Sequence, residues 1–288
     1  MTVSVTKPPA HLAPIAARQW FGPLVYIPAA WLVVAIAATV FAGLLPLPDP
    51  FKQALLRTLQ PPSAAHWLGT DSLGRDVFSR SIVGLRVSLI VGIGSVAFGL
   101  ALGGALGLVS GYFRGLIDLW ISAVMTVVLS FPPLVLAIAI MSYAQPSLVL
   151  VIVVLGILFV PAFARIARAN TLSLVEREFV LAARAIGMRD GFILLREILP
   201  NLVAPLAAYS MLMVAVAIIG EAALSFLGLS VPPPQPTLGG MIAAERANLL
   251  EAPWSVFGPA GFLFLTILSL NIVGDQVQRR LDGREAAI

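Results

Sequence analysis

Six long apolar stretches constrain this sequence more than any other feature. A helix needs roughly 20 apolar residues to cross about 30 Å of hydrocarbon. The stretches that qualify, or nearly do, are 24–45, 87–109, 119–141, 147–164, 202–229 and 256–277. We therefore predict an all-α integral membrane protein with about six transmembrane helices.

The composition supports a membrane protein and excludes several kinds of site. Of the 288 residues, 59% are hydrophobic and only 11% are charged, whereas a soluble domain carries about 25% charged residues. The absence of cysteine excludes disulfides, thiolate nucleophiles and cysteine-based metal sites. His11 and His66 are far apart in sequence, so no metal site and no catalytic centre is predicted. The net charge of +4 lies in short stretches between apolar segments, which favours membrane topology over nucleic-acid binding.

The distribution of basic residues predicts the orientation. Two thirds of the 18 lysine and arginine residues fall on one side of the six stretches, and that side is expected to be cytoplasmic. Both termini then lie in the cytoplasm. The predicted parts are a cytoplasmic N-terminal segment (1–23), a transmembrane domain (24–278) and a cytoplasmic tail (279–288). Within the domain we expect external loops at 46–86 and 230–255 and a cytoplasmic loop at 165–201.

The cytoplasmic loop has a pattern of its own. Ser173 and Glu176 fit a capping box, which predicts the start of a helix. Apolar residues then recur at helical spacing until Gly187, a residue typical of helix ends. A second apolar-faced segment begins at Phe192, and Pro200 predicts its end or a kink. The sequence therefore predicts a helix-turn-helix.

Two interpretations of this loop are open from the residues alone. An amphipathic helix pair could rest on the lipid surface, or the pair could be a docking site for a cytoplasmic partner. The small residues Ala182, Ala183 and Gly187 favour docking, because they let another protein's surface approach closely.

Residues 179–187, Phe-Val-Leu-Ala-Ala-Arg-Ala-Ile-Gly, followed by Ile-Leu-Pro at 198–200, resemble the EAA loop of ABC importer permeases. In that family the loop fits a groove on the ATPase subunit and transmits its motion. The resemblance implies that the coupling residues are Glu178, Ala182, Ala183, Arg184, Gly187, Leu199 and Pro200. The chain departs from the motif at Leu181, where the family has glutamate, and Glu178 lies one helical turn earlier.

Three further stretches narrow the resemblance to permeases for dipeptides, oligopeptides and nickel. They are 66–76, 224–240 and 271–284, and they resemble the second, C-type permease of that group. The family usually has proline where Gly283 stands. The resemblance implies a heterodimer with a second permease, two ATPase subunits, an extracytoplasmic solute-binding protein, a peptide-like substrate and a place in the plasma membrane.

ATP chemistry is not expected in this chain. A P-loop needs a Gly-Lys pair followed by Ser or Thr, and neither Lys7 nor Lys52 follows a glycine. We therefore predict a transport subunit rather than an enzyme, with no cofactor of its own. ATP and Mg²⁺ would bind the partner ATPases, and alternating access would move the solute.

Two features inside the apolar stretches bear on the pathway. Glu221 is an acidic residue in a long apolar segment, so it should face protein or water. It could contact a cationic amine or form a gate, or it could be a partner in a helix–helix hydrogen bond. The six glycines within 92–107 predict close helix packing, with a flexible gate as the alternative. The sequence Phe131-Pro132-Pro133 predicts a kink.

The competing functions differ in what they require. Nickel chelates or glutathione as cargo would need the same permease, so the motifs do not separate them from peptides. A membrane enzyme would need carboxylates, histidines or a nucleophile at one depth, and the charges here are isolated. A scaffold without a transport path would not need an ATPase-docking loop.

Overall fold

The computed structural model describes residues 25–285, and it describes side-chain surroundings as far as residue 279. The predicted N-terminal segment 1–23 lies outside this part. Within it the fold is helical, with one isolated β-bridge between Thr70 and Asp76. The α-helices are α1 (Tyr26–Val40), α2 (Val77–Phe113), α3 (Gly115–Leu129), α4 (Pro133–Ser142), α5 (Leu148–Val175), α6 (Glu178–Ala185), α7 (Asp190–Ile193), α8 (Leu199–Phe226), α9 (Leu238–Glu245) and α10 (Pro253–Glu285). Shorter turns are η2 (Leu55–Arg57), the π turn η3 (Leu194–Ile198) and η4 (Arg246–Asn248).

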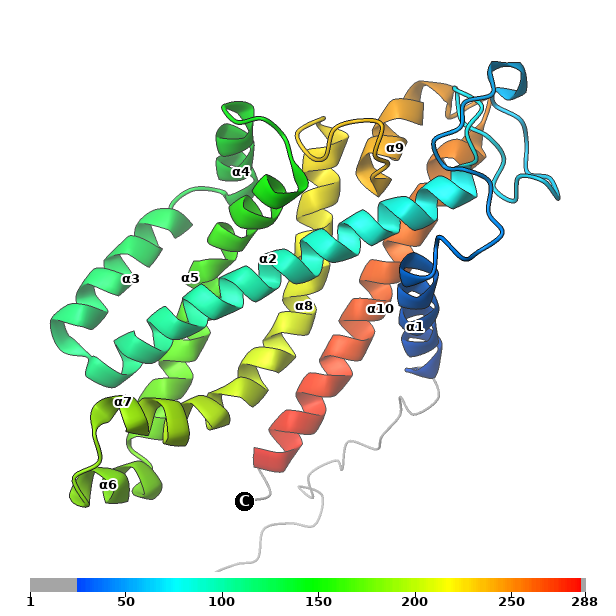
Figure 1. Cartoon of the computed structure of the whole chain (residues 1–288). Coiled ribbons are helices and arrows are strands. Elements are labelled where there is room, and N and C mark those ends of the chain that lie inside the picture. The colour runs from blue at the N-terminus through cyan, green and yellow to red at the C-terminus, as the bar shows by residue number, and fades with distance from the viewer. Residues whose placement is uncertain (1–24, 286–288) are drawn as a thin grey trace, which may run out of the picture.

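The long helices form one elongated bundle (Figure 1). Helix α2 packs along α5 and against α8, while α10 packs against α8 and α1. Figure 1 shows α6, α7 and the end of α10 at one end of the bundle, which we call the α6 end. The connection before α2 and helix α9 lie at the opposite end, the α9 end.

The membrane-spanning character agrees with the prediction, and the count of six is approximate. Within residues 25–285, four continuous helical runs are long and apolar enough to cross a bilayer: Val77–Phe113, Leu148–Val175, Asp190–Phe226 and Pro253–Arg279. The bent pair α3–α4 passes the same test only when its two helices are taken together, as a broken span or a re-entrant loop. The predicted first span is helical only over the 15 residues of α1, which is about 22 Å and shorter than the hydrocarbon layer.

The kink predicted at 131–133 is a complete break. Helices α3 and α4 meet at an angle of 80°. Pro133 is the first residue of α4, a position where the missing N–H of proline has no intrahelical partner to lose. The proline pair therefore ends one helix and starts the next.

Helix α2 begins ten residues before the predicted start at 87. Asp76 is its N-cap and accepts a hydrogen bond from the backbone N of Ser79 at 2.7 Å. Arg80, counted in the predicted external loop, lies inside the helix with 5% of its surface exposed. The predicted helix start was wrong because it treated the charge of Arg80 as a sign of a loop. In the structure Asp71 and the carbonyl of Pro50, 30 residues away, lie against the guanidinium.

The predicted capping box is wrong, and helix α5 extends beyond the predicted span end at residue 164. Helix α5 continues through Ser173 to Val175, and α6 begins at Glu178. The extra turns of α5 stay helical because they still pack on α2, with Arg168 also bound to Asp118 by two hydrogen bonds of 2.6 Å. The connection between the long helices is therefore shorter than 165–201.

Pro200 does not end the second segment of the loop. The helical run from Asp190 to Phe226 is continuous, and Leu199 and Pro200 are the first two residues of α8. The π turn η3 immediately precedes them, and such a turn widens the helix locally. The proline is accommodated at this irregular turn rather than in a regular helix interior.

Close contact between α2 and α5 depends on glycines spaced four residues apart. A Cβ atom at Gly99 would lie 2.8 Å from Cβ of Phe159, and one at Gly103 would lie 2.8 Å from Cβ of Phe163. Both distances are too short for real carbon atoms. The packing interpretation of the glycines is confirmed at these positions.

Candidate functional site

The coupling residues suggested by the EAA-like motif gather at the α6 end. Glu178 is the first residue of α6, and it is exposed together with Ala182 and Arg184. Ala183 is only 5% exposed and faces inward. Leu199, which is partly buried, and Pro200, which is exposed, begin α8 on the other side of the turn.

Gly187 shapes the turn between α6 and α7. Its φ is +77°, a left-handed conformation that side chains disfavour. The N–H of Gly187 donates to the carbonyl of Arg184 at 3.0 Å, and the N–H of Met188 donates to that of Ala183 at 3.1 Å. These two bonds form a Schellman motif. The helix end predicted from the glycine is therefore present.

Helix α6 has two distinct faces. Val180 and Ala183 belong to the main hydrophobic core, together with Ile193 and Ile198. Its outer side carries the exposed side chains of Phe179 and Leu181, and the C-cap residue Ile186 is exposed as well. Phe192 of α7 and Leu195 of η3 are exposed beyond the turn. Exposed apolar residues of this kind fit either a protein partner or a lipid surface. We call Phe179, Leu181, Ala182, Ile186 and Gly187 the α6 surface.

A second contact fixes the α6 turn to the end of α2. The hydroxyl of Tyr112 donates to Oδ1 of Asp190 at 2.6 Å, and the guanidinium of Arg184 lies 4.9 Å from the centre of the Tyr112 ring. The tyrosine itself is 6% exposed. The α6 turn and α7 are therefore joined to the end of α2 through this tyrosine. Sequence reasoning missed Tyr112, because the residues it contacts lie more than 70 positions away and no local pattern connects them.

Glu221 is fully buried within the chain. Its carboxylate accepts hydrogen bonds from Ser88 of α2 at 2.8 Å and from Ser230, after α8, at 3.1 Å. Both serines are also buried. These contacts support the role of a helix–helix hydrogen-bond partner, since the carboxylate joins α2, α8 and the connection that follows α8.

The segment 66–76 is organised by two aspartates. Oδ1 of Asp71 accepts from the backbone N of Leu73 at 3.0 Å and of Arg75 at 2.9 Å, while Oδ2 accepts from Nε of Arg75 at 2.7 Å. Asp76 caps α2 and also lies 2.9 Å from Nδ1 of His66. The motif thus folds a compact turn against the start of α2.

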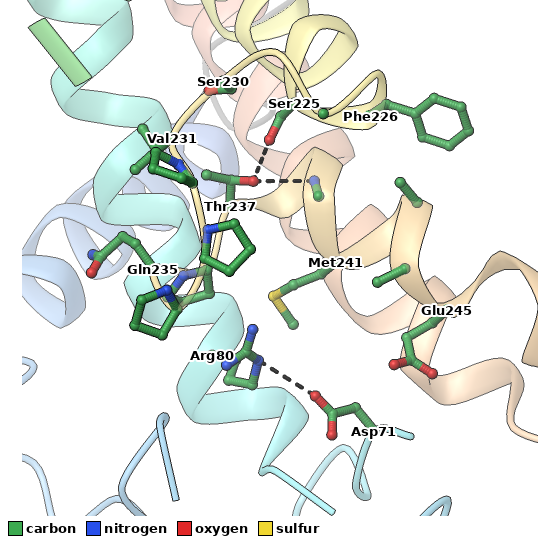
Figure 2. A pocket seen from close by; sticks show the side chains of 18 of the residues that line it. Asp71, Arg80, Ser225, Phe226, Ser230, Val231, Gln235, Thr237, Met241 and Glu245 are labelled. Carbon is green, nitrogen blue, oxygen red and sulfur yellow. Dashed lines mark hydrogen bonds and ion pairs between the residues drawn. The ribbon is translucent and has the colours of Figure 1, made fainter. Parts of the chain in front are cut away.

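A cavity of about 320 Å³ lies beside this turn at the α9 end (Figure 2). Its walls come from the segment 71–80, the end of α8, the proline-rich connection and α9. The connection is held in place by Thr237, which hydrogen-bonds Ser225 and caps α9 by accepting from the N–H of Gly240 at 3.1 Å. The proline run is not helical, as predicted.

The arrangement offers no sign of metal chemistry in the part of the chain that the structure describes. Across residues 25–285, histidine and acidic side chains do not gather in groups of three or more that could hold a metal ion.

Comparisons with known proteins agree on one family. Residues 103–286 match the model of the binding-protein-dependent transport system inner membrane component. The chain is 40% identical over 249 residues to the dipeptide transport system permease protein DppC of Alkalihalophilus pseudofirmus, covering 86% of this chain and 82% of the relative. It is 41% identical over 223 residues to the glutathione transport system permease protein GsiD of Pectobacterium atrosepticum, covering 77% and 74%.

A solved structure shares the fold. A chain of the MetNI methionine ABC transporter, in an inward-facing conformation, superposes with a TM-score of 0.58 at 18% sequence identity. The match covers 70% of this chain and 96% of the solved chain. The helix order described above is therefore that of a known membrane-transport architecture.

Proposed function

The chain belongs to the family of binding-protein-dependent transport system inner membrane components, and we propose that it carries di- or oligopeptides across the plasma membrane. It is a permease subunit of an ABC importer, a transport subunit rather than an enzyme. The peptide cargo is supported by relatives named for dipeptide and glutathione transport, because glutathione is itself a tripeptide. Glutathione and nickel chelates are the alternative cargoes.

The family implies permease and ATPase partners. In our proposal a second permease forms a heterodimer with this chain, and two ATPase subunits bind ATP and Mg²⁺. A solute-binding protein delivers the cargo from outside. The nucleotide-bound ATPases favour one permease state over the other by a few kcal/mol, which is enough to switch the accessible side.

The α6 end is the proposed docking site for an ATPase. The supporting observation is that the α6 surface is exposed while the opposite face of the helix belongs to the core. In this proposal Ala182 and Gly187 let the ATPase approach, and Glu178 and Arg184 contact it. Buried Ala183 holds the helix against the bundle.

The start of α8 completes the proposed coupling route. Leu199 and Pro200 lie directly after the π turn, so a push on α6 that is passed through the Gly187 turn to α7 reaches α8 along one continuous helical run. Tyr112 provides a parallel route to α2. The two routes act on helices that also meet at Glu221.

The proposed orientation places the α6 end and both termini in the cytoplasm. The excess of basic residues on that side supports it. The α9 end then faces outward, where a solute-binding protein docks. Cysteine labelling with a membrane-impermeant maleimide tests this, because the natural chain has no cysteine. A cysteine introduced at Leu250 should react in intact cells. One at Ile186 should react only in permeabilised membranes from which the ATPases have been removed, because an ATPase covers it in this proposal.

Two measurements test the function itself. Pull-down of the tagged chain from native membranes should recover a second permease and P-loop ATPases, identified by mass spectrometry. Uptake of a labelled dipeptide, glutathione and a nickel chelate should then be compared in cells with and without the chain. Dipeptide uptake that depends on the chain supports the proposal. Recovery of the chain alone under mild conditions contradicts the assembly, and uptake of the nickel chelate alone contradicts the peptide cargo.

A further inference from the structure

The cavity at the α9 end contains four charged side chains with unequal hydrogen bonding. Its two carboxylates are fully engaged. Asp71 accepts the three bonds described above. Oε1 of Glu245 accepts from N and Oγ of Ser72 at 3.2 and 2.6 Å, and Oε2 accepts from Nδ2 of Asn248 at 3.0 Å. Every carboxylate oxygen in the wall therefore already has a donor.

In contrast to the carboxylates, the two guanidinium groups leave most of their N–H donors without a hydrogen-bond partner in the part of the chain that the structure describes. Arg80 is 5% exposed and donates through Nη1 to the carbonyl of Pro50 at 2.9 Å. Its Nε lies 3.5 Å from Oδ2 of Asp71 and makes no hydrogen bond. Arg75 donates to a side chain only through Nε. Since each guanidinium has five N–H donors, most of these donors lack an acceptor among the described residues.

The cavity wall consequently carries two guanidinium groups with N–H donors that are unpaired among the described residues, while each carboxylate oxygen already accepts at least one hydrogen bond. Figure 2 shows Arg80 at the cavity wall facing Asp71, with Met241 to its upper right and Gln235 to its upper left. A planar guanidinium matches the two oxygens of a carboxylate and binds it bidentately. The missing partner is therefore an anion with paired oxygens.

The remaining wall suits a small apolar body next to that anion. Pro232, Pro234, Met241 and Ala244 line the cavity. The prolines make the wall stiff, since their φ angles are fixed. A volume of about 320 Å³ lies at the lower limit for small-molecule pockets. The space is adequate for a carboxylate and one attached side chain.

We propose that this cavity is a subsite for the carboxylate end of a small solute, with Arg80 and Arg75 as its partners and the proline-rich connection around the adjoining side chain. The inference rests on the proposed function, in which the cargo is a peptide and so ends in a carboxylate. Asp71 and Glu245 balance the charges of the arginines, so attraction comes from oriented donors and binding is weak. Weak binding suits a subsite that the cargo must leave.

Ligand-observed saturation-transfer NMR on the full chain in lipid nanodiscs tests the proposal, because it detects weak binding. The probes are alanyl-leucine, alanyl-leucinamide, which lacks the carboxylate, and acetyl-leucine, which retains the carboxylate but has no charged amine. We expect both acids to bind. The affinity for the amide should be lower by at least about tenfold, as expected when charge-assisted hydrogen bonds are lost.

Variants locate the binding. Arg80→Gln and Arg75→Gln should each weaken binding of the acids and leave the amide unchanged. Arg246→Gln is the matched control, since this exposed arginine lies just beyond the cavity wall. Two positions are used because Arg80 is buried and its loss could disturb the fold, and a melting curve from tryptophan fluorescence identifies any variant that is misfolded.

Three results would overturn the proposal: equal binding of acid and amide, full binding in both arginine variants, or binding of none of the probes. In the last case, weaker docking of the solute-binding protein to Arg80→Gln would assign the guanidiniums to an acidic side chain of that protein. The importer function is judged separately by recovery of the ATPases, which does not involve this cavity.

Discussion

Replacement of Gly187 separates the fold of the α6 turn from its docking function. The left-handed conformation at φ +77° costs a residue with a side chain about 1–2 kcal/mol. A Cβ at this position meets no atom within 4 Å, so a larger side chain adds bulk on the outside without a clash inside the chain. Gly187→Ala therefore reports the backbone cost alone, and Gly187→Trp adds an aromatic side chain of roughly 150–250 Å² to the surface.

Gly228 provides a matched control at the opposite end of α8. It has φ +75°, its Cβ would also meet nothing within 4 Å, and the same Schellman hydrogen bonds join it and Leu229 to the helix. Gly228→Trp should therefore lower the melting temperature about as much as Gly187→Trp does. Only the change at Gly187 should reduce recovery of the ATPases in a pull-down, by tenfold or more, which corresponds to about 1.4 kcal/mol of lost docking energy.

The assay is co-purification of the ATPases, together with the basal ATP hydrolysis of the recovered complex. Because Gly228 lines the α9-end cavity, neither uptake nor stimulation by cargo is used for this comparison. Full ATPase recovery and normal basal hydrolysis with Gly187→Trp would refute the docking assignment. An equal loss with both tryptophan variants would show that the effect comes from folding and not from the α6 surface.

Three further substitutions test other parts of the structure. Tyr112→Phe keeps the ring under Arg184 but removes the hydrogen bond to Asp190, and a hydrogen bond to a charged group is worth about 1.5–3 kcal/mol. We expect normal ATPase recovery with weaker stimulation of ATP hydrolysis by cargo. Unchanged stimulation would remove Tyr112 from the coupling route. Glu221→Gln keeps an acceptor for one serine and offers a donor to the other, so assembly and uptake should stay within about twofold; lost uptake with normal assembly would instead place Glu221 on the pathway. Gly107→Leu should destabilise the chain by about 1–3 kcal/mol or more, because even a Cβ there would lie 2.6 Å from Cβ of Ala167. Gly261→Leu is the control and should not destabilise the chain, because a Cβ at that position meets open space. The melting temperatures of the two variants are compared by tryptophan fluorescence, and equal values would contradict the packing argument.

The family and the membrane-spanning class could be predicted because both depend on local sequence. Apolar stretches of about 20 residues have few stable fates outside a bilayer. Proline at 132 and 133 cannot continue a helix, and glycine at 187 is suited to a left-handed helix end. Each of these signals is contained within a few neighbouring residues.

The limits of the helices were less predictable, because packing overrides hydropathy. Arg80 and Arg168 were placed in loops by their charge, yet both lie in helices. Arg168 is paired with Asp118, 50 residues away, and Arg80 lies against Asp71 and the carbonyl of Pro50. A hydropathy pattern contains no information on which distant group will neutralise a charge.

The functional residues likewise fall into those that the sequence indicates and those that only the tertiary structure brings together. The sequence alone determined that this is a multi-spanning membrane protein, because length, apolarity and turn chemistry act locally, and its motifs indicated a permease by their resemblance to a known family. Only the tertiary structure decided that Glu221 is held by two serines, that Tyr112 joins α2 to the α6 turn, and that Arg80 retains free donors in a cavity. The physical reason is that hydrogen bonds and cavities depend on distances between residues far apart in the chain, and those distances exist only after the helices have packed.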